Sequence, residues 1–84
     1  MTAEQMFNAR GWTKEKPYMI KNDISYKYDY VDKEDEIWNH TYFINFNTKT
    51  KCFRTFGFNY FGEDESVSIS PDLLKVIIKQ LEEL

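Results

Sequence analysis

Apolar and polar side chains alternate through the middle of the chain. Across residues 24–30 every second position is apolar or aromatic, with polar or charged residues between. This pattern is typical of a half-buried strand, because successive side chains of a strand point to opposite faces of the sheet. We predict a strand there and two more over residues 37–47 and 52–61, joined as a β-hairpin by the turn-forming residues 47–50.

The pairing of the two hairpin strands determines which aromatic side chains share a face. We expect Phe46 to lie opposite Cys52, which places Phe56 opposite Tyr42. One face would then carry nearly all the aromatic residues of both strands. A shift of the pairing by one residue would move Phe56 to the other face, so the register stays open.

The end of the chain has the pattern of an amphipathic helix. Ser70 is a good N-cap, Pro71 suits the first helical position, and Asp72 places negative charge at the positive end of the helix dipole. At about 100° per residue the apolar side chains fall within one arc, with Lys and Glu opposite. The residues predicted to be buried are Leu73, Leu74, Ile77, Ile78, Leu81 and Leu84.

A short helix is predicted at the start of the chain, over residues 3–9. Thr2 and Gln5 have the spacing of a capping box, and Gly11 suits the left-handed position that ends a helix. Pro17 interrupts the following polar stretch, so residues 18–21 are at best an edge strand. The element order predicts one α+β domain over residues 1–84. It has a three- to four-stranded antiparallel meander and a C-terminal helix packed on one sheet face.

Composition indicates how so short a chain can fold. Seven Phe, six Tyr and two Trp among 84 residues supply large side chains for a core that needs neither disulfide nor metal. Cys52 is the only cysteine, which excludes an intrachain disulfide and a cysteine-based zinc site and suits a reducing compartment. The first residues lack the apolar segment of a signal peptide, so we expect a cytoplasmic protein.

The charge of the chain bears on its partners. The formal net charge is −3 and the pI is near 5.1. Nucleic-acid-binding proteins usually have a basic surface, so these values argue against general nucleic-acid binding. The charge is too small to establish an acidic surface that mimics DNA.

Few residues of the sequence could carry chemistry. His40 is the only histidine, and the sequence places no partner beside it. Cys52 has basic residues nearby, but an inert packing cysteine is the more common interpretation. The acidic runs at residues 32–36 and 63–65 lack the spacing of a calcium loop. We therefore expect no enzyme, no catalytic residue, and neither a metal nor a cofactor site.

A second set of apolar residues alternates with the first and would face away from the helices. A monomer rarely leaves such a stripe in water. The N-terminal segment could cover it, a different register could remove it, or it could be a protein interface, either a homodimer through the sheet or a partner's surface. The residues of this predicted interface are Val31, Ile37, Phe43, Phe53 and Phe61. Alternatively, the aromatic residues form a single-strand nucleic-acid platform with Lys27, Lys49, Lys51 and Arg54.

Three segments resemble small proteins encoded by phages and prophages of low-GC Gram-positive bacteria. They are residues 1–12 (MTAEQMFNARGW), the predicted hairpin at residues 42–53 (YFINFNTKTKCF) and residues 68–84 (SISPDLLKVIIKQLEEL). These segments consist of caps and core positions, so the resemblance transfers no site residues. It implies an accessory protein of the host-cell cytoplasm that binds a host or phage protein, a class that includes anti-CRISPR and other host-takeover inhibitors.

The sequence thus predicts a small non-enzymatic accessory protein that acts by binding another protein, with no membrane association. The alternative is a nucleic-acid-associated protein. It would either bind a single strand through its aromatic residues or mimic DNA through its acidic loops.

Overall fold

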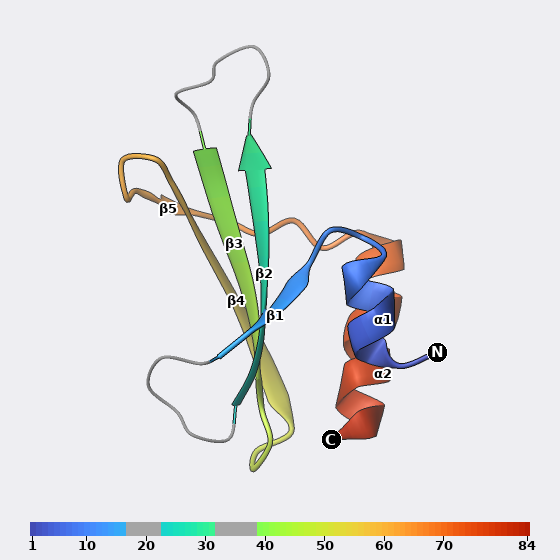
Figure 1. Cartoon of the computed structure of the whole chain (residues 1–84). Coiled ribbons are helices and arrows are strands. Elements are labelled where there is room, and N and C mark those ends of the chain that lie inside the picture. The colour runs from blue at the N-terminus through green and yellow to red at the C-terminus, as the bar shows by residue number, and fades with distance from the viewer. Residues whose placement is uncertain (17–22, 32–38) are drawn as a thin grey trace.

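The computed structural model describes residues 1–16, 23–31 and 39–84. Its elements in chain order are α1 (Ala3–Asn8), β1 (Thr13–Glu15), β2 (Asp23–Val31), β3 (Asn39–Asn47), β4 (Cys52–Asn59), β5 (Asp64–Glu65) and α2 (Pro71–Glu83). The strands form one antiparallel sheet in the order β1-β2-β3-β4-β5, and both helices lie to one side of it (Figure 1). The predicted α+β class, with a meander between two helices, is confirmed.

α1 begins at the predicted capping box. The Thr2 hydroxyl accepts a hydrogen bond from the Gln5 N–H at 3.2 Å, and the Gln5 side-chain oxygen accepts one from the Thr2 N–H at 2.9 Å. These contacts satisfy two of the donors that the first turn of a helix leaves unpaired. Gly11 follows the helix with a φ of 88°, the left-handed conformation predicted for it.

An edge strand occurs where the sequence predicts none. β1 comprises three exposed polar or charged residues, so it has no apolar alternation by which a strand could be recognised. The predicted edge strand at residues 18–21 lies outside the described residues. β5 likewise falls within a stretch predicted to be an acidic loop.

α2 is rotated relative to its predicted orientation. Its buried residues are Leu73, Val76, Ile77 and Gln80. Leu74 and Ile78 are 43% and 46% exposed, so their predicted burial is wrong.

Two polar contacts accompany this orientation of α2. The Arg10 guanidinium donates to both Asp72 carboxylate oxygens, at 2.6 and 3.0 Å, and the Tyr26 hydroxyl donates to Gln80 Oε1 at 2.6 Å. Positions 72, 76 and 80 follow one another at intervals of four residues, so they share a face of the helix. Hydrophobic periodicity takes no account of such polar contacts.

One hydrophobic cluster joins residues of both helices and of the sheet. The Phe7 ring from α1 stacks on the Tyr26 ring from β2, with centroids 4.0 Å apart. Burial raises the pKa of Tyr26 to about 12, so its hydroxyl stays protonated and donates to Gln80 at neutral pH. The buried residues of the cluster are Phe7, Trp12, Tyr26, Ile44, Phe46, Leu73, Val76 and Ile77. No helix in the described ranges is long and apolar enough to cross a membrane.

The predicted hairpin register is wrong by one residue. Phe46 lies opposite Phe53, and Phe43 lies opposite Phe56. The cause is Asn47, which ends β3 and pairs with Cys52, so that the connecting loop has four residues, 48–51.

The conformation of the turn explains why Asn47 belongs to the strand. Its side-chain oxygen accepts hydrogen bonds from the N–H groups of Lys49 and Thr50, both at 2.9 Å, and its backbone oxygen accepts one from the Lys51 N–H. Lys51 takes a left-handed φ of 59° that reverses the chain. An Asn side chain can bond to the backbone two residues ahead and so stabilise a turn that begins at its own position.

Candidate functional site

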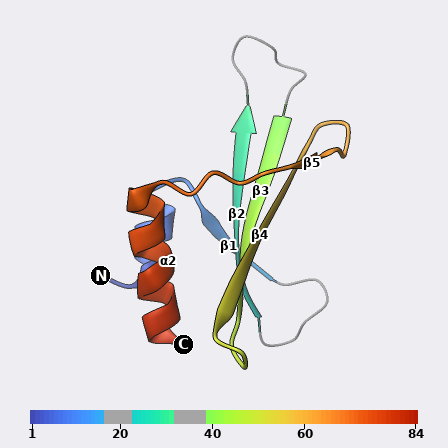
Figure 2. The same cartoon turned by 180° about the vertical axis from the view of Figure 1, so that it is seen from behind.

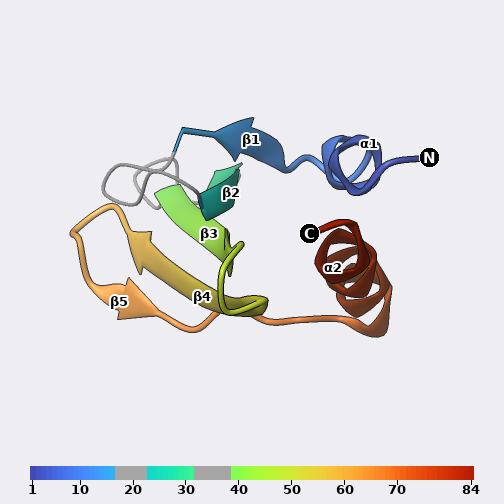
Figure 3. The ribbon, with the colours of Figure 1, turned by 90° about the horizontal axis from the view of Figure 1, so that it is seen from below.

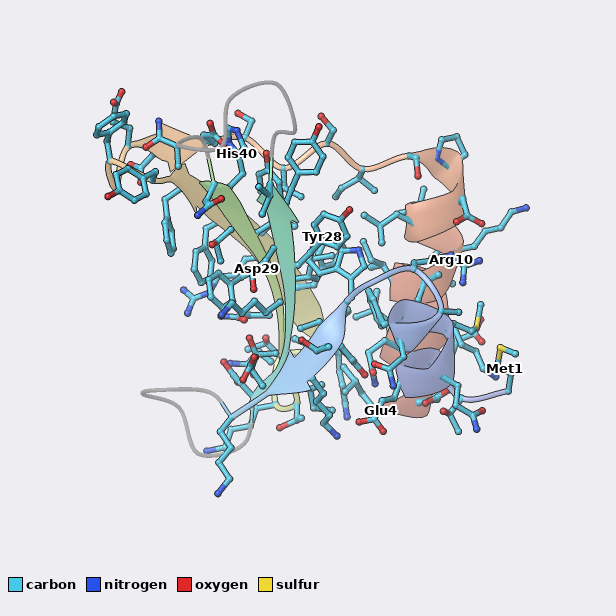
Figure 4. The ribbon with its side chains drawn as sticks, turned by 45° about the horizontal axis from the view of Figure 1, so that its top comes forward. Met1, Glu4, Arg10, Tyr28, Asp29 and His40 are labelled. Carbon is cyan, nitrogen blue, oxygen red and sulfur yellow. The ribbon has the colours of Figure 1, made fainter. Side chains whose placement is uncertain are left out.

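The sheet has two faces of different character. Tyr26 contacts Phe7 and Gln80, so it marks the inner face, which is turned toward the helices. Its neighbours along β2 point the other way. Figure 4 shows Tyr28 on the side of the helices and Asp29 on the opposite side. Strand parity and register place the following residues of β2, β3 and β4 on the outer face: Asp23, Ser25, Lys27, Asp29, Val31, Asn39, Thr41, Phe43, Asn45, Asn47, Cys52, Arg54, Phe56 and Phe58.

Three phenylalanine rings lie together on the outer face. The rings of Phe43 and Phe56 are stacked, with centroids 4.8 Å apart and an interplanar angle of 17°, and the Phe58 centroid lies 6.1 Å from that of Phe43. Phe56 is 43% exposed and Phe58 is 37% exposed. We call these three residues the phenylalanine cluster. It is an apolar surface on the face of the sheet turned away from the hydrophobic cluster that joins the helices to the sheet.

Basic, acidic and polar side chains lie around the phenylalanine cluster. Lys27 lies opposite Phe43 in the sheet, and its ammonium group is 3.5 Å from the Asp29 carboxylate. The Thr41 hydroxyl donates to the same carboxylate at 3.0 Å. Arg54 lies on the outer face two residues before Phe56. The outer face therefore combines an aromatic centre with a rim of mixed charge.

The predicted interface residues do not all lie on one surface. Val31 and Phe43 belong to the outer face. Phe53 is on the inner face, where its ring centroid is 6.1 Å from that of Phe46. Phe61 follows β4, and its ring lies edge-on to that of Tyr60. The remaining predicted residue, Ile37, lies outside the described residues.

Sequence reasoning missed two members of the phenylalanine cluster, Phe56 and Phe58, because the assumed register placed them on the other face. The signal that could have placed them is the Asn47 side chain, which makes Asn47 the last residue of β3 and shortens the loop. Of the predicted basic residues, Lys27 and Arg54 lie on the outer face. Cys52 is exposed, and its thiol donates to the Thr50 carbonyl at 3.5 Å.

His40 has a partner that the sequence did not reveal. Its Nδ1 lies 2.6 Å from Oε2 of Glu65, and the same oxygen accepts a hydrogen bond from the Tyr42 hydroxyl at 3.2 Å. Burial, and next the Glu65 charge, raise the pKa of Tyr42. His40 and Glu65 are 25 positions apart in the chain, so local sequence patterns could not indicate the contact.

A glycine makes this contact possible. Gly57 lies between Tyr42 of β3 and Glu65 of β5 in one row of the sheet. Because Gly57 has no side chain, the Glu65 side chain can extend across β4 to the Tyr42 hydroxyl. The network of His40, Tyr42 and Glu65 holds the short strand β5 against the sheet. Among the described residues, no three His, Cys, Asp or Glu side chains lie together as metal ligands would.

Replacing Gly57 by alanine is expected to destabilise the fold by about 1–3 kcal/mol, as overpacking does. A Cβ at this position would lie 2.5 Å from Cδ1 of Tyr42, so the ring would have to move away from Glu65. Urea unfolding measures the loss. The same substitution in a Tyr42→Ala background should cost less, because the clash with the ring is gone and only the Thr41 carbonyl oxygen, at 3.2 Å, remains close. An unchanged or increased stability of Gly57→Ala in the wild-type background would contradict the close packing of Tyr42 on Gly57.

A cleft of about 340 Å³ lies between the inner face and the start of α2. Trp12, Tyr28 and Tyr42 supply aromatic surface to it, and the ion pair of Arg10 and Asp72 lines its other side. The hydrogen bonds of this pair raise the pKa of Arg10 and lower that of Asp72. The guanidinium of Arg10 is thereby already engaged by a carboxylate of the chain itself.

No protein-family model, curated protein or solved structure matches the chain.

Proposed function

We propose that this protein is a non-enzymatic accessory protein that binds another protein through the outer face of its sheet. The observation that carries the proposal is the phenylalanine cluster, whose rings contact one another while two remain well exposed. Aromatic side chains are enriched at the centres of protein interfaces, where they contribute most of the binding energy. The phage origin and host-cytoplasmic location implied by the resemblance belong to the same proposal.

The rim of the cluster supports a protein partner over a nucleic acid. Lys27 and Asp29 form an ion pair beside the rings, so the positive charge at this point is already balanced. A mixed rim around an apolar centre is the usual composition of a protein interface. The partner is either a different protein or a second copy of the chain, since a face with both signs of charge can complement itself.

The alternative is a nucleic-acid-associated protein, favoured by the positions of Lys27 and Arg54 on the same face as the rings. Stacking rings beside basic side chains bind single strands without sequence preference. Salt-sensitive binding of labelled oligonucleotides, titrated at two salt concentrations, would support this alternative. Competition with DNA for a DNA-binding protein would instead support mimicry by the acidic loops. Of those loops, residues 32–36 lie outside the described residues, and Glu65 is turned toward His40.

Replacing Phe56 by serine is expected to weaken partner binding by about thirty-fold, the effect of losing an interface residue worth about 2 kcal/mol. Phe56 is substantially exposed, so the fold should lose little stability. The partner is captured from host lysate with the wild-type chain, identified by mass spectrometry, purified and titrated. Sedimentation of the protein alone determines whether the partner is a second copy.

Ile78→Ser is the matched control for this experiment. Ile78 is 46% exposed, close to the 43% of Phe56, but it lies on α2, away from the outer face. Its replacement should leave binding unchanged. Equal losses for the two variants, or a strictly monomeric protein that captures no partner, would contradict the proposal.

A further inference from the structure

β4 is paired along its whole length on one side and over only two residues on the other. β3 pairs with every residue of β4, whereas β5 pairs only with Gly57 and Phe58. Among the described elements, no strand lies beside residues 52–56 on that side. Figure 2 shows the lower part of β4 with no other element in front of it. An unpaired strand edge can add an extended chain as a further strand.

The backbone groups that face this open side can be identified from the end of β4. The Asn59 N–H donates to the Glu63 carbonyl at 3.0 Å, and the Asn59 carbonyl accepts from the Gly62 N–H at 2.9 Å. Along an antiparallel strand, successive residues direct their N–H and C=O groups to opposite edges. Phe53 and Thr55 therefore direct theirs to the open side. A strand added there could form hydrogen bonds with two donors and two acceptors.

The side chains beside the open edge indicate the chemistry of the added strand. Arg54 and Phe56 lie on the outer face, while Phe53 lies on the inner face and is 36% exposed. Residues 48–56 contain three basic residues and no Asp or Glu, whereas the acidic residues 63–65 lie beside the other end of β4, at Gly57 and Phe58. Cross-strand neighbours of opposite charge stabilise a sheet. The complementary strand is therefore acidic and carries apolar side chains in alternation.

We infer that the open edge of β4 binds an extended acidic peptide segment of another protein, which adds to the sheet beside Phe53 and Thr55. The inference rests on the proposed function, because Arg54 and Phe56 belong to the outer face, and it specifies the class of partner. In the register that uses the donors and acceptors of both Phe53 and Thr55, a second copy fits this edge poorly. Antiparallel pairing of β4 with itself centred on Arg54 would bring two guanidinium groups directly opposite, and like charges in that position destabilise a pair.

The test uses a synthetic peptide of alternating valine and glutamate, and the same peptide with lysine in place of glutamate. Each is titrated into the full-length ¹⁵N-labelled protein. The glutamate peptide should shift the amide resonances of residues 51–56 in a saturable way and slow hydrogen exchange at Phe53 and Thr55. The lysine peptide should bind at least about ten-fold more weakly, a difference that added salt reduces.

Two variants test the mode of binding. Thr55→Pro removes an outward N–H and should abolish peptide binding, while an edge strand tolerates proline where the N–H faces away from the sheet. Arg54→Glu should reverse the preference, so that the lysine peptide binds more tightly than the glutamate peptide. This second variant keeps the test decisive if Thr55→Pro does not fold.

The outcomes separate this inference from the proposed function. No saturable shift with the glutamate peptide, shifts confined to other elements, or an unchanged preference in Arg54→Glu would overturn the inference. Self-association of the wild-type chain that Thr55→Pro abolishes would also overturn it, because the occupant would then be a second copy. A natural partner that needs Phe56 but tolerates both edge variants would leave the proposed function standing alone. A partner that tolerates Phe56→Ser as well would refute both.

Discussion

Replacing Ile77 by alanine is expected to lower the free energy of unfolding by about 2–5 kcal/mol. The Ile77 side chain is fully buried in the cluster that joins α2 to the sheet and to α1. Truncation removes apolar surface from the core and leaves a cavity that a packed interior fills only in part. Urea unfolding followed by circular dichroism measures the loss, provided that the dependence on urea concentration is unchanged.

The next residue supplies the control. Ile78→Ala changes the same residue type in the same helix, so helix propensity cancels between the two variants. Ile78 is 46% exposed, and its truncation should cost less than about 1 kcal/mol. Similar losses at both positions would mean that α2 has the orientation predicted from hydrophobic periodicity instead of the one that the structure has.

Replacing Phe7 by alanine is expected to cost about 3–5 kcal/mol, the range observed for large aromatic side chains in cores. Phe7 is fully buried and stacks on Tyr26, with Trp12 and Phe46 edge-on to its ring. α1 has only six residues, too few for a helix to be stable by itself. Loss of this ring should therefore release α1 as a whole, seen as faster hydrogen exchange over residues 3–9 and a lower unfolding free energy.

Phe53→Ala is the comparison for this variant. Phe53 lies on the same face of the sheet and also contacts Phe46, but it is 36% exposed. Its loss should be clearly smaller than that of Phe7, because less surface returns to water. If Phe53→Ala destabilises the protein as much as Phe7→Ala, the core is centred nearer the hairpin than the structure places it.

The parts of the fold that the sequence predicts correctly depend on local contacts. Thr2 and Gln5 cap α1 within one turn, and Ser70 caps α2 by accepting from the Leu73 N–H. The alternation in β2 reflects one buried face. In contrast, β1 has no buried side chain, and in the observed orientation of α2 Asp72 and Gln80 contact residues distant in the sequence. Patterns of hydropathy contain no information on such contacts.

The candidate site was only partly predictable for a related reason. Strand parity is set by where a turn begins, so a single residue, Asn47, moves Phe56 and Phe58 from one face to the other. The partner of His40 comes from β5, a strand of two residues within an acidic stretch. Phe43 and Val31 do lie on the predicted face. Each belongs to a long strand, and the alternation of apolar and polar residues within that strand indicates its face without reference to the turn.

The contacts between the two helices join residues that are far apart in the sequence. Figure 3 shows α1 and α2 side by side. The Ala3 N–H donates to the Glu83 carboxylate at 2.9 Å across a sequence separation of 80 residues, and the ion pair of Arg10 and Asp72 spans 62. Contacts of such separation are slow to form, because the chain entropy of closing the loop is lost first. A nascent chain therefore cannot complete this core until α2 has been synthesised, and α1 stays unformed until then.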